Sequence, residues 1–199
     1  MSAIEASASM TLTTRGAELQ GILAATEVTD AEGVRRDTDK AILDLVASLV
    51  DLRHRGGRLY LVGNGGSAAV AGHAANDFLN VAKLRASTLH EPSLLSCMSN
   101  DYGWEAAFAR ILSTLAAPGD MLIAISSSGQ SANIRNAAAE MRKCGARVVT
   151  LSGFRQNNPL RSIGQVNFWL NSSDYGMVEI GHQFVLHNVA DRLRLGMSS

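Results

Sequence analysis

Four side chains that can bind a metal ion or move protons stand at two spacings in this sequence. His73 and Asp77 are four residues apart, and Glu179 and His187 are eight apart. Residues at i and i+4 share a helix face, so the first pair can ligate one ion together. A regular helix separates the second pair by about 12 Å, whereas zinc ligands lie about 2 Å from the ion. If Glu179 and His187 belong to one type of site, we expect a helix broken near Gly181, or ligands from different subunits.

His182 adds a second spacing to the same segment. It follows Glu179 by three residues, the Glu-x-x-His spacing of di-iron helix bundles. The chain holds no second copy of this motif, so a packed or interface histidine is the favoured interpretation.

Two loops of small residues follow short apolar runs. Gly63-Asn-Gly-Gly-Ser67 follows residues 58–62, and Ser126-Ser-Ser-Gly-Gln-Ser131 follows residues 121–125. Glycines let the backbone approach an anion, serines donate hydrogen bonds, and a helix behind each loop presents free N–H groups. One such loop is also typical of an ordinary turn between a strand and a helix. Two of them predict a phosphorylated ligand.

Neither loop matches the common nucleotide-binding motifs. Gly63-Asn-Gly-Gly-Ser67 lacks the third glycine of Gly-x-Gly-x-x-Gly, and the chain has no Gly-Lys-Ser or Gly-Lys-Thr. We expect a phosphate monoester, bound mainly by hydroxyl and backbone N–H groups.

The elements that must position these residues alternate between strand and helix. Helical spacing predicts helices over about 14–25, 31–54, 67–79, 132–144 and 178–195, and apolar runs predict strands at 58–62, 93–97, 121–125, 147–151 and 166–170. This order predicts an α/β fold with a parallel sheet covered on both faces. Both loops should then lie at the carboxyl edge of the sheet, where ligands bind.

Composition narrows the possible partners. The chain has 199 residues, with 18 Lys and Arg against 18 Asp and Glu, so we expect no nucleic-acid and no membrane partner. No apolar run approaches the roughly 20 residues that cross a bilayer, and the amino terminus lacks a secretory signal. Two cysteines favour a cytoplasmic setting. We expect a flexible tail over 1–12 and a single domain over 13–199.

Three motifs together resemble the SIS (sugar isomerase) domain family, and within it the phosphoheptose isomerase branch. They are Gly63-Asn-Gly-Gly-Ser67 with His73, then Ser96-Cys-Met-Ser-Asn-Asp101, and Ile125-Ser-Ser-Ser-Gly-Gln-Ser-Ala-Asn133. The resemblance runs from about residue 35 to 195. It implies a five-stranded parallel sheet between helices, a flavodoxin-like three-layer sandwich with N-terminal helices before the first strand, and homotetramers with interfacial sites.

The resemblance also implies site residues. It assigns substrate binding to Asn64, Gly65, Gly66, Ser67, Asp77, Asn100, Asp101, Ser126, Ser127, Ser128, Ser131 and Glu179, and a Zn²⁺ ion to His73, Asp77, Glu179 and His187. Two positions depart from the branch, which carries Glu where this chain has Asp77 and Gln where it has Glu179. The branch's acidic residue before the final helix is also unmatched, because Asp174-Tyr175-Gly176 is arranged differently.

The implied reaction is aldose–ketose exchange through an enediol, which needs a base, an acid and a polarised carbonyl. Asp77 is the candidate base and His187 the candidate acid, although the roles could be reversed. An aspartate that also ligates a metal is a weaker base, so the two roles conflict. We expect an isomerase of sedoheptulose 7-phosphate. The alternatives are an isomerase of an eight-carbon sugar phosphate, or a non-catalytic module that binds a sugar phosphate or a protein partner, like a replication-initiation regulator.

Overall fold

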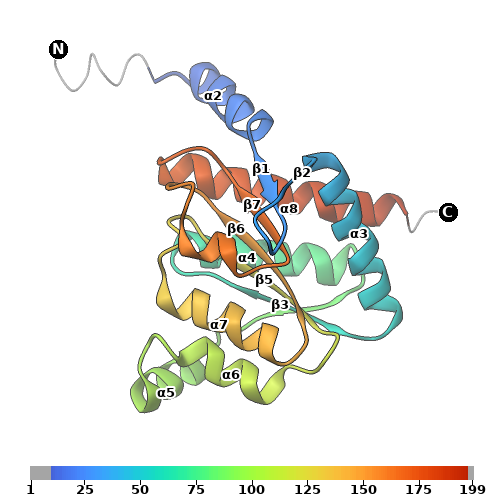
Figure 1. Cartoon of the computed structure of the whole chain (residues 1–199), viewed down its shortest axis with the longest axis vertical. Helices are drawn as coiled ribbons and strands as arrows, with labels where there is room; N and C mark the ends of the chain where they lie inside the picture. Colours follow the sequence, from blue (N-terminus) through green and yellow to red (C-terminus); the bar gives the residue numbers. More distant parts are fainter. Residues whose placement is uncertain (1–9, 197–199) are drawn as a thin grey trace.

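Alternating side chains along the central strands divide the core into two layers. In the computed structural model, which describes residues 10–196, Leu59 and Leu61 face one layer while Tyr60 and Val62 face the other. This alternation follows from the two-residue period of a strand. The sheet is therefore buried on both faces, as expected for parallel strands (Figure 1).

The strands form one sheet in the order β2-β1-β7-β6-β5-β3-β4. Their bounds are β1 Glu27–Thr29, β2 Arg35–Arg36, β3 Arg58–Val62, β4 Arg85–Thr88, β5 Met121–Ser126, β6 Arg147–Ser152 and β7 Val166–Trp169. The last five in that order run parallel, and β1 runs antiparallel to both β7 and β2. The prediction of a five-stranded sheet was therefore wrong, since seven strands are present.

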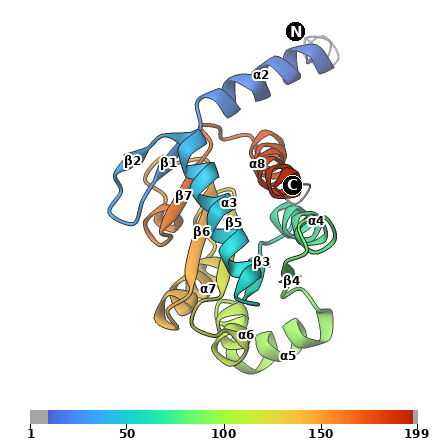
Figure 2. The same cartoon turned by 90° about the vertical axis from the view of Figure 1, so that its right-hand side faces the viewer.

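Helices cover both faces of this sheet. They are α2 Leu12–Ala24, α3 Thr38–His54, α4 Gly66–Asn80, α5 Pro92–Tyr102, α6 Ala107–Leu115, α7 Ala132–Lys143, the 3-10 helix η1 Pro159–Ser162, and α8 Tyr175–Leu195. Helices α3, α4 and α8 pack on one face, and α6 and α7 pack on the other (Figure 2). Within 10–196, no helix combines the length and apolar character needed to cross a membrane.

The two added strands form a hairpin where we predicted the start of a helix. Asp30 Oδ1 accepts hydrogen bonds from the N–H groups of Glu32 and Val34, and Gly33 has a φ of +78°. This turn places Val28 beside Phe168 of β7. The helix predicted over 31–54 therefore begins only at Thr38, capped by Asp37. Helices α2 and α3 precede the strand at 58–62, as expected, but the hairpin lies between them.

The predicted strand at 93–97 is also wrong, because these residues belong to α5. The Glu91 carboxylate accepts hydrogen bonds from the N–H groups of Ser93 and Leu94, and Pro92 occupies the first turn. Both features start helices. The strand at the edge of the sheet beside β3 is instead β4, whose Ala86 is buried between exposed residues.

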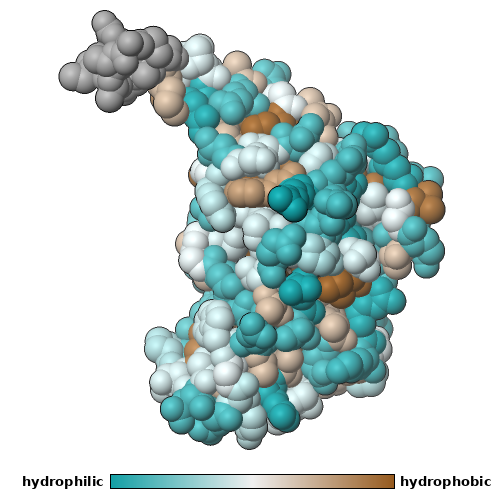
Figure 3. Space-filling model, turned by 60° about the vertical axis from the view of Figure 1, so that its left-hand side comes forward, coloured by the Kyte–Doolittle hydropathy of each residue, from teal (hydrophilic) through white to brown (hydrophobic). Residues whose placement is uncertain are grey.

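Helix α2 projects from one end of the molecule (Figure 2), the end that is uppermost in the space-filling view (Figure 3). Arg15 ties it to the start of α8 through an ion pair with Asp174, 2.9 Å between Nη2 and Oδ2. Ile22 is its one buried residue and packs with Leu170 and Met177. Residues 1–9 of the expected tail lie outside the described residues, and its boundary at residue 12 stays a prediction.

Candidate phosphate pocket and metal centre

The two small-residue loops meet at the point where strand order reverses. They follow β3 and β5, which are neighbours in the sheet although β4 lies between them in the chain. Ser67 Oγ lies 3.5 Å from Ser127 Oγ, and the side-chain amides of Asn64 and Asn133 form two hydrogen bonds of 2.9 Å. Such a switch point at the carboxyl edge is the usual ligand site of α/β sheets.

A cavity of about 270 Å³ lies between these loops and is the candidate phosphate pocket. Its lining residues are Asn64, Gly65, Gly66, Ser67, Ser126, Ser127, Ser128, Ser131, Tyr175 and Glu179. Helix α4 begins at Gly66, and Ser131 is the N-cap of α7, so two helix amino ends face the cavity. No lysine or arginine is among these lining residues. A phosphate would be held by hydroxyl groups, backbone N–H groups and helix dipoles.

Glu179 is the only acidic residue in the cavity lining. Its carboxylate packs against the α-carbon of Gly66, where an added Cβ would collide with it. The glycine at the start of α4 thus leaves room for this carboxylate.

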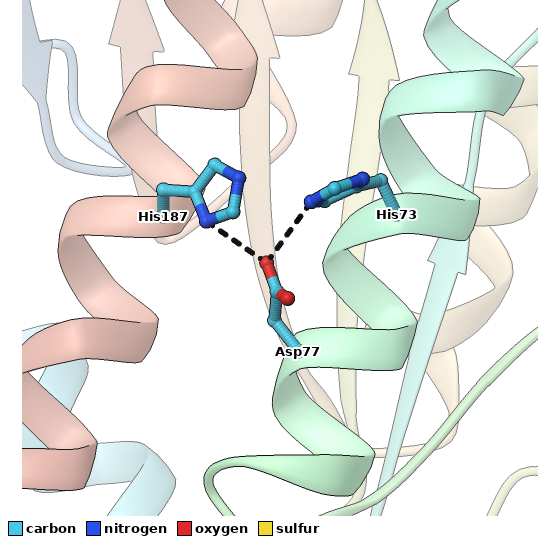
Figure 4. A group of neighbouring side chains, drawn as sticks. All are labelled: His73, Asp77 and His187. Atoms are coloured by element: carbon cyan, nitrogen blue, oxygen red, sulfur yellow. Dashed lines mark ion pairs between the residues drawn. The ribbon is translucent and has the colours of Figure 1, made fainter.

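A second cluster lies between α4 and α8 and consists of His73, Asp77 and His187 (Figure 4). Asp77 Oδ2 lies 3.5 Å from His73 Nε2 and 3.0 Å from His187 Nδ1. The two imidazole rings meet edge to face, with centroids 4.7 Å apart. The side chains of His73 and His187 are 55% and 45% exposed, so solvent reaches the cluster.

The distances from Asp77 to the two histidines suit a metal ion shared by these side chains. Two ligand atoms at 2.0 Å from a tetrahedral zinc ion stand about 3.3 Å apart, close to the 3.0 and 3.5 Å observed around Asp77 Oδ2. This oxygen is buried and has no well-directed hydrogen bond within the described residues. A cation would satisfy it, and nitrogen and carboxylate ligands suit zinc.

Comparisons with known proteins identify the family of this chain. The sequence model of the SIS domain matches residues 25–153. The chain belongs to the SIS domain family. It is 34% identical over 166 residues to a phosphoheptose isomerase of Pelobacter propionicus, covering 80% of this chain and 87% of that protein.

Two solved structures of phosphoheptose isomerases share this fold. The Neisseria gonorrhoeae enzyme has a TM-score of 0.78 and 24% identity, covering 92% of this chain and 96% of that one. The Francisella tularensis enzyme has a TM-score of 0.81 and 22% identity, covering 97% and 98%. At these identities the structures support the fold, while the more similar relative supports the family.

The structure separates the four predicted metal ligands of this SIS domain. His73, Asp77 and His187 form one cluster, whereas Glu179 lines the phosphate pocket. Helix α8 is continuous from Tyr175 to Leu195, which excludes the first of the two alternatives, a break near Gly181. The second, ligands from different subunits, stays a prediction. The glycine at position 181 instead allows close packing, because a Cβ there would collide with the Leu170 side chain.

Asn100 and Asp101 stand apart from both clusters. They lie at the end of α5, where the Asn100 side-chain amide donates to Asp101 Oδ1 at 3.0 Å, and neither lines the pocket. Tyr175, in contrast, lines the pocket although we did not single it out. Its spacing of four residues before Glu179 was the available signal.

Two further histidines serve the packing around the site. His182 is fully buried, its Nε2 lies 3.1 Å from the carbonyl oxygen of Ser152, and burial lowers its pKa to about 4. This confirms a packed histidine. His90 lies with Nε2 3.0 Å from the carbonyl oxygen of Gly63, and burial lowers its pKa as well. Both rings support strand ends that lead into the site.

Proposed function

We propose that this SIS domain is a ketol-isomerase that interconverts sedoheptulose 7-phosphate and an aldoheptose 7-phosphate. The observation that carries the proposal is that one helix, α4, contributes to both groups of residues. Its first turn lines the phosphate pocket, and its side toward α8 carries His73 and Asp77 (Figure 4). The seven-carbon substrate is supported by the 34% identical relative named phosphoheptose isomerase.

The proton transfers follow from the acid and base available. The Asp77 carboxylate removes a proton from C1 of the ketose while protonated His187 donates a proton to O2, which gives an enediol. The carboxylic acid, whose proton exchanges with solvent, then gives a proton to C2, and neutral His187 removes the proton of the C1 hydroxyl. The product is the aldose, and both side chains recover their starting states. The 3.0 Å between them lets one side chain balance the charge of the other.

Zinc at His73, Asp77 and His187 would supply polarisation of the substrate carbonyl when bound. Ligation makes the Asp77 carboxylate a weaker base, so the same aspartate cannot serve both roles fully within one site. We propose that Glu179 of a second copy completes the ligand set, because its own chain leaves it in a pocket without a positively charged side chain.

We therefore propose a homotetramer with sites between subunits. Ile180 and Phe184 of α8 and Leu79 of α4 are 57%, 55% and 54% exposed, on the helices that carry the metal cluster. Burying such residues against a second copy would contribute about 1.5 to 3 kcal/mol each. We also propose a cytoplasmic setting, since Cys97 and Cys144 are free thiols.

Subunit mixing tests the shared site. Asp77→Ala and Glu179→Ala variants are purified separately, then unfolded and refolded together in equal amounts. If each site takes Asp77 from one chain and Glu179 from another, some mixed sites hold both residues and isomerase activity reappears. The control is each variant refolded alone. Activity that stays at the level of the separate variants, in mixtures shown by native mass spectrometry to contain both chains, would contradict a shared site.

A further inference from the structure

Tyr175 is an aromatic residue at the phosphate pocket to which no role has been given so far. It is the first residue of α8 and lines the pocket beside residues 126–131, here called the serine loop, yet it is 60% exposed. A ring that both lines a cavity and meets solvent lies at the mouth of that cavity. Glu179 stands one helical turn further on, so the two side chains share a face of α8.

The start of α8 fixes the position of this ring. Asp174 is the N-cap, with Oδ1 accepting a hydrogen bond from the Met177 N–H at 3.0 Å and Oδ2 paired with Arg15 at 2.9 Å. These contacts lower the pKa of the Asp174 carboxyl, so it stays charged near neutral pH. The backbone that carries Tyr175 is thus held from both sides.

The ring of Tyr175 also has a packing partner of unusual conformation. Phe154, which follows β6, contacts it with ring centroids 4.7 Å apart. Phe154 has a φ of +57°, which costs energy for a residue with a bulky side chain. Its N–H donates to the carbonyl oxygen of Ser172 at 2.8 Å, which stabilises this conformation. A strained residue that supports a ring at a pocket mouth is typical of a ligand-binding site.

We propose that Tyr175 recognises the sugar part of the ligand. With the phosphate held by the serine loop, the hydroxylated carbon chain leaves the pocket past Glu179 and Tyr175. The ring offers an apolar face to C–H groups, and the phenol can donate to a sugar hydroxyl. Tyr175 is then a specificity-determining residue of the proposed isomerase, and this inference rests on that proposed function only in taking a sugar phosphate as ligand.

Calorimetry with two ligands separates this role from a general effect on the pocket. The dissociation constants of sedoheptulose 7-phosphate and of inorganic phosphate are measured for the wild type, Tyr175→Phe and Tyr175→Ala. We expect Tyr175→Ala to weaken sugar-phosphate binding about 5- to 10-fold and Tyr175→Phe about 3-fold, with phosphate binding within about 2-fold of wild type. Tyr102→Phe removes an exposed phenol hydroxyl outside the pocket and is the control.

The possible outcomes distinguish the role of Tyr175 from the proposed isomerase function. If the wild type prefers the sugar phosphate to inorganic phosphate and Tyr175→Ala keeps that preference, the role of Tyr175 is overturned and the proposed function stands. Equal losses for both ligands would also overturn it. If the wild type binds sedoheptulose 7-phosphate no better than inorganic phosphate, both the role of Tyr175 and the proposed function are overturned. Thermal unfolding is measured for each variant to check that it is folded like the wild type.

Discussion

The Asp77 carboxylate lies 3.0 Å from Nδ1 of His187, so a contact between a carboxylate and an imidazole joins α4 and α8. These helices are far apart in the sequence but pack side by side (Figure 4). A single substitution on either helix should therefore separate catalysis from ligand binding, because the phosphate pocket lies elsewhere on both.

We expect His187→Gln to abolish turnover and leave binding nearly intact. Glutamine fills a similar space but cannot donate a proton as imidazolium does, and general acid–base catalysis contributes about 10²- to 10⁴-fold. Steady-state rates and calorimetric binding of sedoheptulose 7-phosphate check this. His54→Gln, at the exposed end of α3, is the control. Residual activity within about 10-fold of wild type would exclude His187 as the acid.

The serine loop should carry the affinity for phosphate. Ser128→Ala combined with Ser131→Ala removes two hydroxyl groups from the pocket, and hydrogen bonds to charged groups contribute about 1.5 to 3 kcal/mol each. We expect inorganic phosphate to bind at least about 10-fold more weakly. Ser113→Ala, on the exposed side of α6, should have no effect. Unchanged affinity in the double variant would place the phosphate elsewhere.

Gly66→Ala should act through Glu179. The added methyl group would collide with the Glu179 carboxylate, which can swing away because it is the end of a flexible side chain. We expect little loss of stability but a loss of turnover close to that of Glu179→Ala. The variant with both substitutions should then be no worse than Glu179→Ala alone, since coupled positions are not additive. Fully additive losses would show that Gly66 and Glu179 act independently.

Stability should fall as pH drops, partly because of His182. Its pKa is about 4 in the folded chain against about 6.5 when exposed, so the unfolded chain binds a proton first. The neutral buried ring contributes its full stability above about pH 6.5, and about 3 kcal/mol is lost as pH falls to about 4. Urea unfolding at pH 7, 5.5 and 4.5 should give a flatter profile for His182→Gln than for the wild type. Parallel profiles would contradict this contribution.

The parts of the fold that depend on strong local patterns were predictable from the sequence. The buried runs at 58–62 and 121–125 are β3 and β5, and both following loops lie at the carboxyl edge. The segment at 93–97 was misread because its apolar residues suit a strand, while the Glu91 cap and Pro92 that start a helix were overlooked. The hairpin of β1 and β2 was missed because its strands are three and two residues long.

Only part of the candidate site was predictable from the spacing of its residues, because Asn100 and Asp101 lie outside the pocket and Tyr175 lines it. The i, i+4 spacing of His73 and Asp77 was sufficient to place them together, and the structure adds His187. Spacing also indicated that Glu179 and His187 of one straight helix do not share a site. It did not explain why residue 181 is glycine, because the close neighbour is the side chain of Leu170, which comes from another segment. Tyr175 required tertiary structure, because its partner Phe154 comes from another segment.

Proton exchange followed by NMR tests the central claim most directly. The purified protein is incubated with sedoheptulose 7-phosphate in D₂O, with and without added Zn²⁺, and the C1 and C2 signals are recorded. The account predicts deuterium at C1 of the ketose together with an aldose deuterated at C2, and a faster reaction with Zn²⁺. Binding without deuterium uptake or aldose, with Zn²⁺ present and every histidine intact, would contradict the proposed isomerase and favour a module that only binds its ligand.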